Sequence, residues 1–177
     1  IGVTFYQLMA KYAISLPIAA TAAGIGAILS SFAMAGQAIG KIGLGIISDR
    51  SVKLGSTVSL VCGLIALTTM WLFPVSPIVL YVAGFLFGWY YAFALVQLPS
   101  MVRTAFGVRE FAQIYAKVGA AGAFASAVAL PLLSFILEAT GGNWAVLFIL
   151  VLSIIAGSYF VFMAALKGAE GLEHTTE

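Results

Sequence analysis

Residues 54–102 read LGSTVSLVCGLIALTTMWLFPVSPIVLYVAGFLFGWYYAFALVQLPSMV, and none of these 49 residues is charged. A helix that crosses the hydrocarbon core of a bilayer needs about 20 apolar residues, so this run is too long for one crossing. The sequence Pro74-Val75-Ser76-Pro77 near its middle is a turn signal. The run therefore predicts two membrane-spanning helices, at 55–73 and 77–100, joined by a short turn.

The composition of the whole chain agrees with a membrane protein. Of its 177 residues, 63% are hydrophobic and 8% are charged, whereas a soluble domain carries about 25% charged residues. So few charges cannot cover a surface that faces water, which argues against a soluble enzyme, a nucleic-acid-binding protein and a disordered chain. The net charge of +2 is too small to indicate a polyanionic partner, so no nucleic acid is expected.

Other uncharged stretches predict three further spans, at 22–47, 113–137 and 143–165. Backbone polar groups in lipid must be paired within the protein, and the stretches lack the alternating pattern of a barrel strand, so they are read as helices. Residues 1–10 are apolar but too short to cross, and they read as the end of a sixth helix. The sequence thus predicts an all-α integral membrane fold with five complete spans, and the simplest expectation is a C-terminal fragment of a larger protein.

Basic residues predict how the spans are oriented. They gather in alternate connections and at the end of the chain: Arg50, Lys53, Arg103, Arg109 and Lys167, with Lys41 and Lys117 in spans toward the same side. Only Lys11 lies opposite. Because basic residues remain on the cytoplasmic side, the 48–54 and 101–112 loops and the C-terminus are expected to be cytoplasmic, in the cell membrane or inner membrane. Residues 1–167 would form the bundle, and 168–177 a disordered cytoplasmic tail.

The most specific motif is Gly45-Ile46-Ile47-Ser48-Asp49-Arg50-Ser51-Val52-Lys53. A glycine lets two helices approach closely. A carboxylate at a helix end can accept hydrogen bonds from the N-terminus of a neighbouring helix, where the dipole is positive. Arg50 and Lys53 can anchor the connection among lipid phosphates and pair with Asp49, or they can act only as determinants of topology.

This motif resembles the loop signature of the major facilitator superfamily: a glycine, three residues, Asp-Arg and a short basic turn. Val52 and Leu54 depart from the usual pattern, which suggests the degenerate copy in the second half of such proteins. The resemblance extends along the chain through Gly84-x-x-x-Gly88, Gly119, Gly122 and Pro131, and Glu138-Ala139-Thr140-Gly141-Gly142. In family order it runs from the end of helix 7 to the C-terminus.

The resemblance implies a secondary transporter in which two six-helix halves bind a small solute between them and give alternating access to it. An N-terminal six-helix half would then be the partner of this chain, beside the lipid bilayer and the substrate. The spans at 22–47, 77–100 and 113–137 would line the cavity. The spans at 55–73 and 143–165 would be peripheral. No cofactor is implied.

Ionisable residues within spans are the first candidates for substrate contact, because a charge there is costly. Lys41 lies eight residues before Asp49, about 12 Å deeper along the helix. In the monocarboxylate and oxalate/formate-type branches, which the chain resembles most, an arginine often occupies this place and contacts the substrate carboxylate, and Lys41 could do similar work as a point charge. Lys117 lies where the oxalate/formate branch carries a lysine. Both lysines could instead snorkel to the headgroups.

Gln37, Tyr90 and Gln97 are candidates for hydrogen bonds to a substrate, with packing as the alternative for the tyrosine. The two Gly-x-x-x-Gly motifs, Gly36 to Gly40 and Gly84 to Gly88, are interpreted as close-packing faces. The preferred function is transport of a small organic anion, and the chain is not expected to be an enzyme. A transporter of a sugar or drug and a structural membrane subunit remain open.

Several absences in the sequence also bear on mechanism. No Asp or Glu lies deep in a span, so a proton-coupling carboxylate would have to lie in the other half. The single cysteine, Cys62, permits no internal disulfide, and His174 lies in the tail. No metal site and no catalytic group are predicted.

Overall fold

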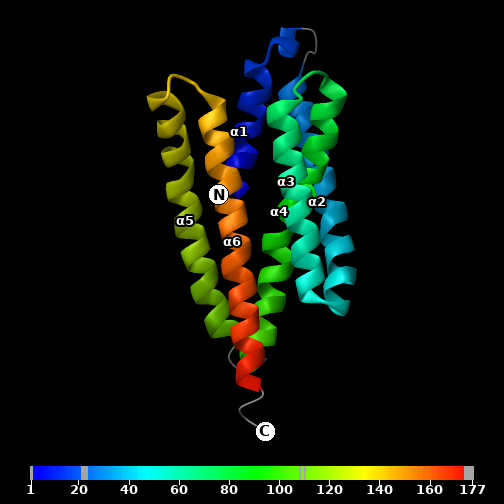
Figure 1. Ribbon diagram of the computed structural model, residues 1–177, viewed down its shortest axis with the longest axis vertical. Coiled ribbons are helices and arrows are strands. Elements are labelled where there is room, and N and C mark those ends of the chain that lie inside the picture. The colour runs from blue at the N-terminus through cyan, green and yellow to red at the C-terminus, as the bar shows by residue number, and fades with distance from the viewer. Residues whose placement is uncertain (1, 21–23, 108, 110, 174–177) are drawn as a thin grey trace.

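The computed structural model describes residues 2–20, 24–107, 109 and 111–173 (Figure 1). These residues form six α-helices and one 3-10 turn, with no strand among them. The elements are α1 (Gly2–Ser15), η1 (Pro17–Ala20), α2 (Ile25–Arg50), α3 (Val52–Leu72), α4 (Pro77–Phe106), α5 (Phe111–Ala139) and α6 (Trp144–Glu173). In the described residues, α2 to α6 are long and apolar enough to cross a membrane. The predicted all-α fold with five spans is therefore confirmed.

Local chemistry explains where the helices end. Pro77 occupies the first turn of α4, and the preceding Ser76 caps the helix, because its hydroxyl accepts a hydrogen bond from the Ile78 N–H at 3.3 Å. At the other predicted turn, Gly141 and Gly142 have φ angles of 66° and 82°. These angles fall in the left-handed region that glycine adopts without steric cost, so α5 ends and α6 can begin.

Two connections are shorter than the sequence indicated. Ser51 alone separates α2 from α3 among the described residues, so the expected 48–54 loop is wrong and Asp49 and Arg50 are helical. Ser51 caps α3 by accepting a hydrogen bond from the Leu54 N–H at 3.3 Å, which allows the next helix to start at once. Likewise, α4 continues to Phe106 and α5 starts at Phe111, inside the expected 101–112 loop.

The C-terminal segment also differs from the prediction. Helix α6 continues to Glu173, so the expectation of a disordered tail is wrong for residues 168–173. This stretch and the turn before it contain alanine, leucine, lysine and glutamate, which favour a helix, and the two glycines do not break it. Residues 174–177, with His174, lie outside the described residues.

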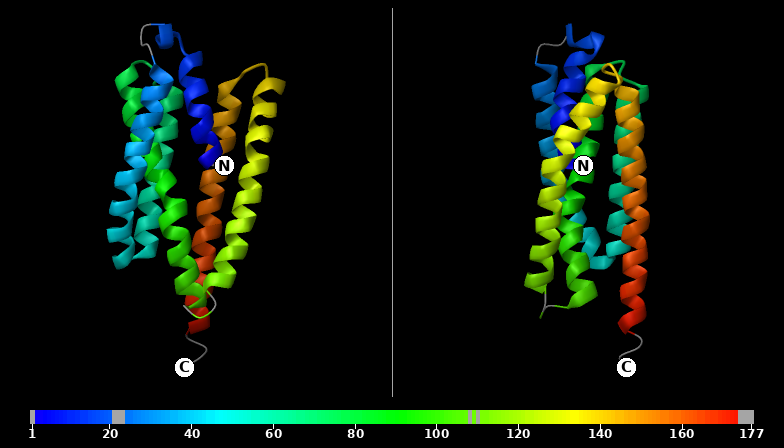
Figure 2. Two further views of the ribbon diagram at one scale, coloured as in Figure 1. Left: turned by 180° about the vertical axis from the view of Figure 1, so that it is seen from behind. Right: turned by 90° about the vertical axis from the view of Figure 1, so that its left-hand side faces the viewer.

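The helices alternate in direction, so their connections gather at two ends (Figure 1). One end, here called the basic end, holds Ser51, the α4–α5 connection and the end of α6. The opposite end holds the α3–α4 and α5–α6 turns and the end of α1. Helices α3 and α6 pack against each other on one side of the bundle, and α1, α2 and α5 lie on the other (Figure 2). The contact between α3 and α6 includes a hydrogen bond of 2.8 Å between the hydroxyls of Thr57 and Tyr159.

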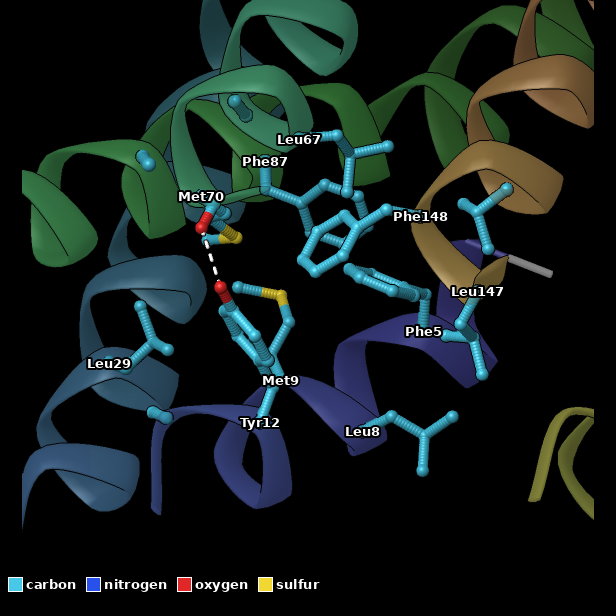
Figure 3. Close-up of a cluster of buried hydrophobic side chains, with 14 of the residues drawn as sticks. Phe5, Leu8, Met9, Tyr12, Leu29, Leu67, Met70, Phe87, Leu147 and Phe148 are labelled. Carbon is cyan, nitrogen blue, oxygen red and sulfur yellow. Dashed lines mark hydrogen bonds between the residues drawn. The ribbon is translucent and has the colours of Figure 1, made fainter. Parts of the chain in front are cut away.

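The short helix α1 is the centre of the hydrophobic core. It lies between the group formed by α2, α3 and α4 and the pair formed by α5 and α6 (Figure 2). Figure 3 shows its side chains inserted among those of the neighbouring helices. Phe5 makes edge contacts with Phe87 of α4 and Phe148 of α6, at centroid distances of 5.6 and 5.3 Å. The Tyr12 hydroxyl donates a 2.7 Å hydrogen bond to the Met70 carbonyl of α3.

The closest helix pair is α2 with α4, which make the most extensive contact in the bundle. A Cβ placed on Gly36 would overlap the Phe85 backbone, and one on Gly40 would come within 2.9 Å of the Trp89 Cα. A Cβ on Gly84 would come within 2.5 Å of the Leu29 side chain. Only glycine allows this approach, so both Gly-x-x-x-Gly motifs are packing faces, as predicted.

Candidate functional site

Helix α2 carries the first candidate, Lys41, and exposes two faces of different character. With 3.6 residues per turn, one face combines short side chains with the long but unbranched Met34 and Lys41, and is here called the short-side-chain face: Ala27, Ser31, Met34, Ala38, Lys41 and Gly45. The other, about 100° away, has mostly bulky apolar ones, Ile28, Phe32, Ile39, Ile42 and Ile46, with the small Ala35 among them. The bulky face matches a surface against lipid tails. Lys41 therefore projects beside the bulky apolar face rather than within it.

Gln37 lies one turn before Lys41 and 40° further round α2, at the border of the α4 contact. Its side chain is half-buried, whereas Lys41 is exposed. No hydrogen bond or ion pair to either side chain occurs among the described residues. The two side chains are close enough in the helix to contact one small ligand together.

Lys117 has a different setting. On α5 it is in register with Phe124, Val128 and Phe135, which follow at steps of seven, four and seven residues. All four side chains are exposed, and the two phenylalanines are 74% and 67% accessible. Lys117 thus lies on the bulky apolar face of α5, about two turns from the basic end. This position favours the snorkelling alternative.

Tyr90 is half-buried between α3, α4 and α6. It packs over Gly63 of α3, where a Cβ would come within 2.7 Å of the tyrosine ring. It also lines a cavity of about 30 Å³ between α3, α4 and α6, together with Ser56 and Tyr159. A volume of this size holds about one or two water molecules and is too small for an organic solute. The packing alternative therefore describes Tyr90 in this structure.

Gln97 is fully buried, with none of its surface accessible. Its side chain lies where α2, α3 and α4 meet, and its Nε2 donates a 2.5 Å hydrogen bond to the Ser48 hydroxyl. In this conformation a substrate cannot reach it. Sequence reasoning placed Gln97 on a cavity face because burial depends on which neighbours pack against a helix, and a single sequence does not show them.

The loop signature is at the basic end, where Asp49 and Arg50 are exposed in the last turn of α2 and Lys53 is half-buried in the first turn of α3. No helix of the described chain approaches Gly45 closely, since nothing lies within 4 Å of a Cβ placed there. The close approach occurs at Gly55, which the sequence analysis did not single out. The predicted capping by the Asp49 carboxylate is also not seen, since the Ser51 hydroxyl caps α3.

The described residues contain no group of three or more His, Cys, Asp or Glu side chains that could hold a metal ion. Comparison with curated proteins and with solved structures gives no significant match. The family model of the Major Facilitator Superfamily, in contrast, matches residues 1–175. This match covers nearly the whole chain, and it agrees with the five apolar spans and with the signature at the α2–α3 connection. The chain therefore belongs to the major facilitator superfamily of multi-pass membrane transporters.

Proposed function

We propose that this chain is part of a secondary active transporter that moves a small organic anion by alternating access, with Lys41 as the cation that holds the anion. The observation that carries the proposal is the position of Lys41. It is a charge well inside a span, on the face of α2 with short side chains rather than the bulky apolar one. An ionisable side chain at such a place is costly unless it meets water or a ligand.

The proposed site is the surface of the bundle that includes the short-side-chain face of α2. A second six-helix bundle would cover this face and enclose the substrate between the two. The Lys41 ammonium would form a charge-assisted hydrogen bond to a carboxylate, and the Gln37 amide, one turn away, would donate a second one. The basic end would face the cytoplasm, because Arg50, Lys53, Arg103 and Arg109 lie there.

A neutral solute is the second candidate. Lys41 lies about 12 Å from Asp49 along the helix axis, and a lysine stem can extend part of this way toward the headgroups. If the ammonium does so, the cavity face of α2 carries no charge and suits a sugar better than an anion.

Uptake by the full-length transporter in proteoliposomes separates these candidates. The variants are Lys41→Gln and Lys41→Arg, with Lys117→Gln as the matched control on the bulky face of α5. Hydrogen bonds to charged groups contribute about 1.5–3 kcal/mol, so Lys41→Gln is expected to reduce carboxylate uptake at low substrate by about tenfold or more. Lys41→Arg should retain much of it, and Lys117→Gln should retain nearly all.

Unchanged carboxylate uptake by Lys41→Gln would contradict the anion proposal. If no carboxylate is transported while a labelled sugar is, the neutral-solute candidate replaces it.

A further inference from the structure

A buried amide on α4 makes a hydrogen bond beside the α2–α3 connection. Gln97 Nε2 on α4 donates to the Ser48 hydroxyl on α2 at 2.5 Å. The same hydroxyl donates to the Leu44 carbonyl one turn earlier, which holds it in one orientation. The acceptor for Gln97 is therefore a side chain that cannot turn away without losing its own hydrogen bond.

Gly55 on α3 completes this arrangement from the other side. A Cβ at residue 55 would overlap Gln97 Nε2 and would come within 2.9 Å of the Ser48 Oγ. Gly55 is buried, and its N–H bonds to the Ser51 carbonyl at 3.1 Å. The glycine thus lets α3 approach the amide so closely that α2, α3 and α4 meet at one point.

Ser48 lies three residues before Ser51 and Gly55 four residues after it, so the two contacts flank the connection that carries Asp49 and Arg50. We propose that Gln97 is a positioning residue, which holds the Asp49–Arg50 connection on α4 through Ser48 and Gly55. A displacement of α4 would then carry the signature with it. This inference rests on the proposed function, transport by alternating access, and adds the premise that the Asp49–Arg50 signature takes part in it.

The chemistry of the amide supports a positioning role over simple packing. No partner of Gln97 Oε1 occurs among the described residues, and a buried, unpaired amide oxygen costs free energy. A leucine would fill similar space without this cost, but it would lack the bond to Ser48. Gln97→Leu therefore removes the hydrogen bond and largely keeps the volume.

Hydrogen exchange of the full-length transporter measures how firmly the α2–α3 connection is held, and it needs no transport assay. The amides of Ser51 and Gly55 are hydrogen-bonded to the Ile47 and Ser51 carbonyls, and the Leu54 amide to the Ser51 hydroxyl. Loss of one net hydrogen bond corresponds to a change of about two- to tenfold in an opening equilibrium. We expect exchange in this segment to become about fivefold faster in Gln97→Leu and Ser48→Ala, with no change at the α3–α4 turn.

A double-variant cycle tests the contact with Gly55. Gly55→Ala should accelerate exchange because its methyl displaces the amide, whereas Gly45→Ala, with open space around it, should not. In the Gln97→Ala background the methyl meets no amide and only the Ser48 Oγ remains within 2.9 Å, so adding Gly55→Ala should cause a clearly smaller change than it does in the wild type.

Unchanged exchange at Ser51–Gly55 in both Gln97→Leu and Ser48→Ala would overturn the positioning role, whatever the uptake. Equal, additive effects of Gly55→Ala in both backgrounds would overturn the contribution of Gly55. Faster exchange together with unaltered uptake would support the positioning role and count against the signature's part in transport.

Discussion

Gly88 on α4 lies directly against the backbone carbonyl of Ala33 on α2, so closely that a Cβ at residue 88 would overlap the oxygen. Both partners belong to helix backbones, so neither can move aside as a flexible side chain would. The α2–α4 pair, the most extensive contact in the bundle, thus brings backbone against backbone, and it sets the direction in which Lys41 projects.

Gly88→Ala is expected to destabilise the protein by about 2 kcal/mol, because the added methyl forces two helices apart. Thermal unfolding in detergent, followed by the reactivity of the Cys62 thiol, measures the effect. Gly119→Ala is the matched control: nothing lies within 4 Å of its Cβ position, and alanine is the better helix former. A melting temperature of Gly88→Ala equal to that of Gly119→Ala would contradict the close approach.

Tyr12→Phe is expected to cost about 1–2 kcal/mol, since it leaves the buried Met70 carbonyl without the hydroxyl that donates to it at 2.7 Å. This bond joins α1 to α3 in the core of Figure 3. Tyr115→Phe serves as the control, because the Tyr115 ring stacks on Phe111 and its hydroxyl has no partner among the described residues. Equal melting temperatures for the two variants would show that the bond contributes nothing.

Ser59→Ala is expected to stabilise the protein, by about 1 kcal/mol. The Ser59 side chain is fully buried, and its Oγ has no hydrogen-bond partner in the described part of the chain. Removal of an unpaired buried hydroxyl recovers its desolvation cost. Ser56→Ala, one turn earlier, should give no such gain, because the Ser56 hydroxyl already donates to the Val52 carbonyl at 2.7 Å. A lower melting temperature for Ser59→Ala would contradict this account.

Asp49→Asn is expected to reduce uptake by about tenfold or more while membrane insertion and stability remain intact. The carboxylate lies exposed in the last turn of α2, where the helix dipole disfavours a negative charge, so neutralising it does not weaken the helix. Uptake and melting temperature, measured on the same preparation, separate the two effects. Glu138→Gln, an exposed acid at the opposite end, should transport normally. Wild-type uptake by Asp49→Asn would remove the proposed role of the signature.

The sequence predicted the spans well because their causes are local. An uncharged run favours a span within that run. Pro77 starts the helix in which it lies, and Gly141 and Gly142 form the turn that they occupy. The sequence did not predict the burial of Gln97, because that burial depends on α2 and α3, which lie far away in the chain. Lys41 and Lys117 differ in the helix face on which they lie, and the sequence analysis considered only how deep each lysine is in its span. The amide that meets Ser48 and Gly55 gave no sequence signal beyond a polar residue in an apolar span.

The buried side chains of helix α5 lie near one of its ends. The buried residues of α5, among those the structure describes, are Ala129, Leu133 and Leu137. Pro131 lies between the first two of them in the sequence. Proline removes a backbone hydrogen bond at this point and weakens the helix against bending. Phe111 and Pro131 are 20 residues apart, so this part of α5 forms a lever arm of about 30 Å, and a bend of about 10° at the proline would sweep the Phe111 end through about 5 Å. A small change of angle beside the α1 core is thereby amplified at the far surface of the membrane.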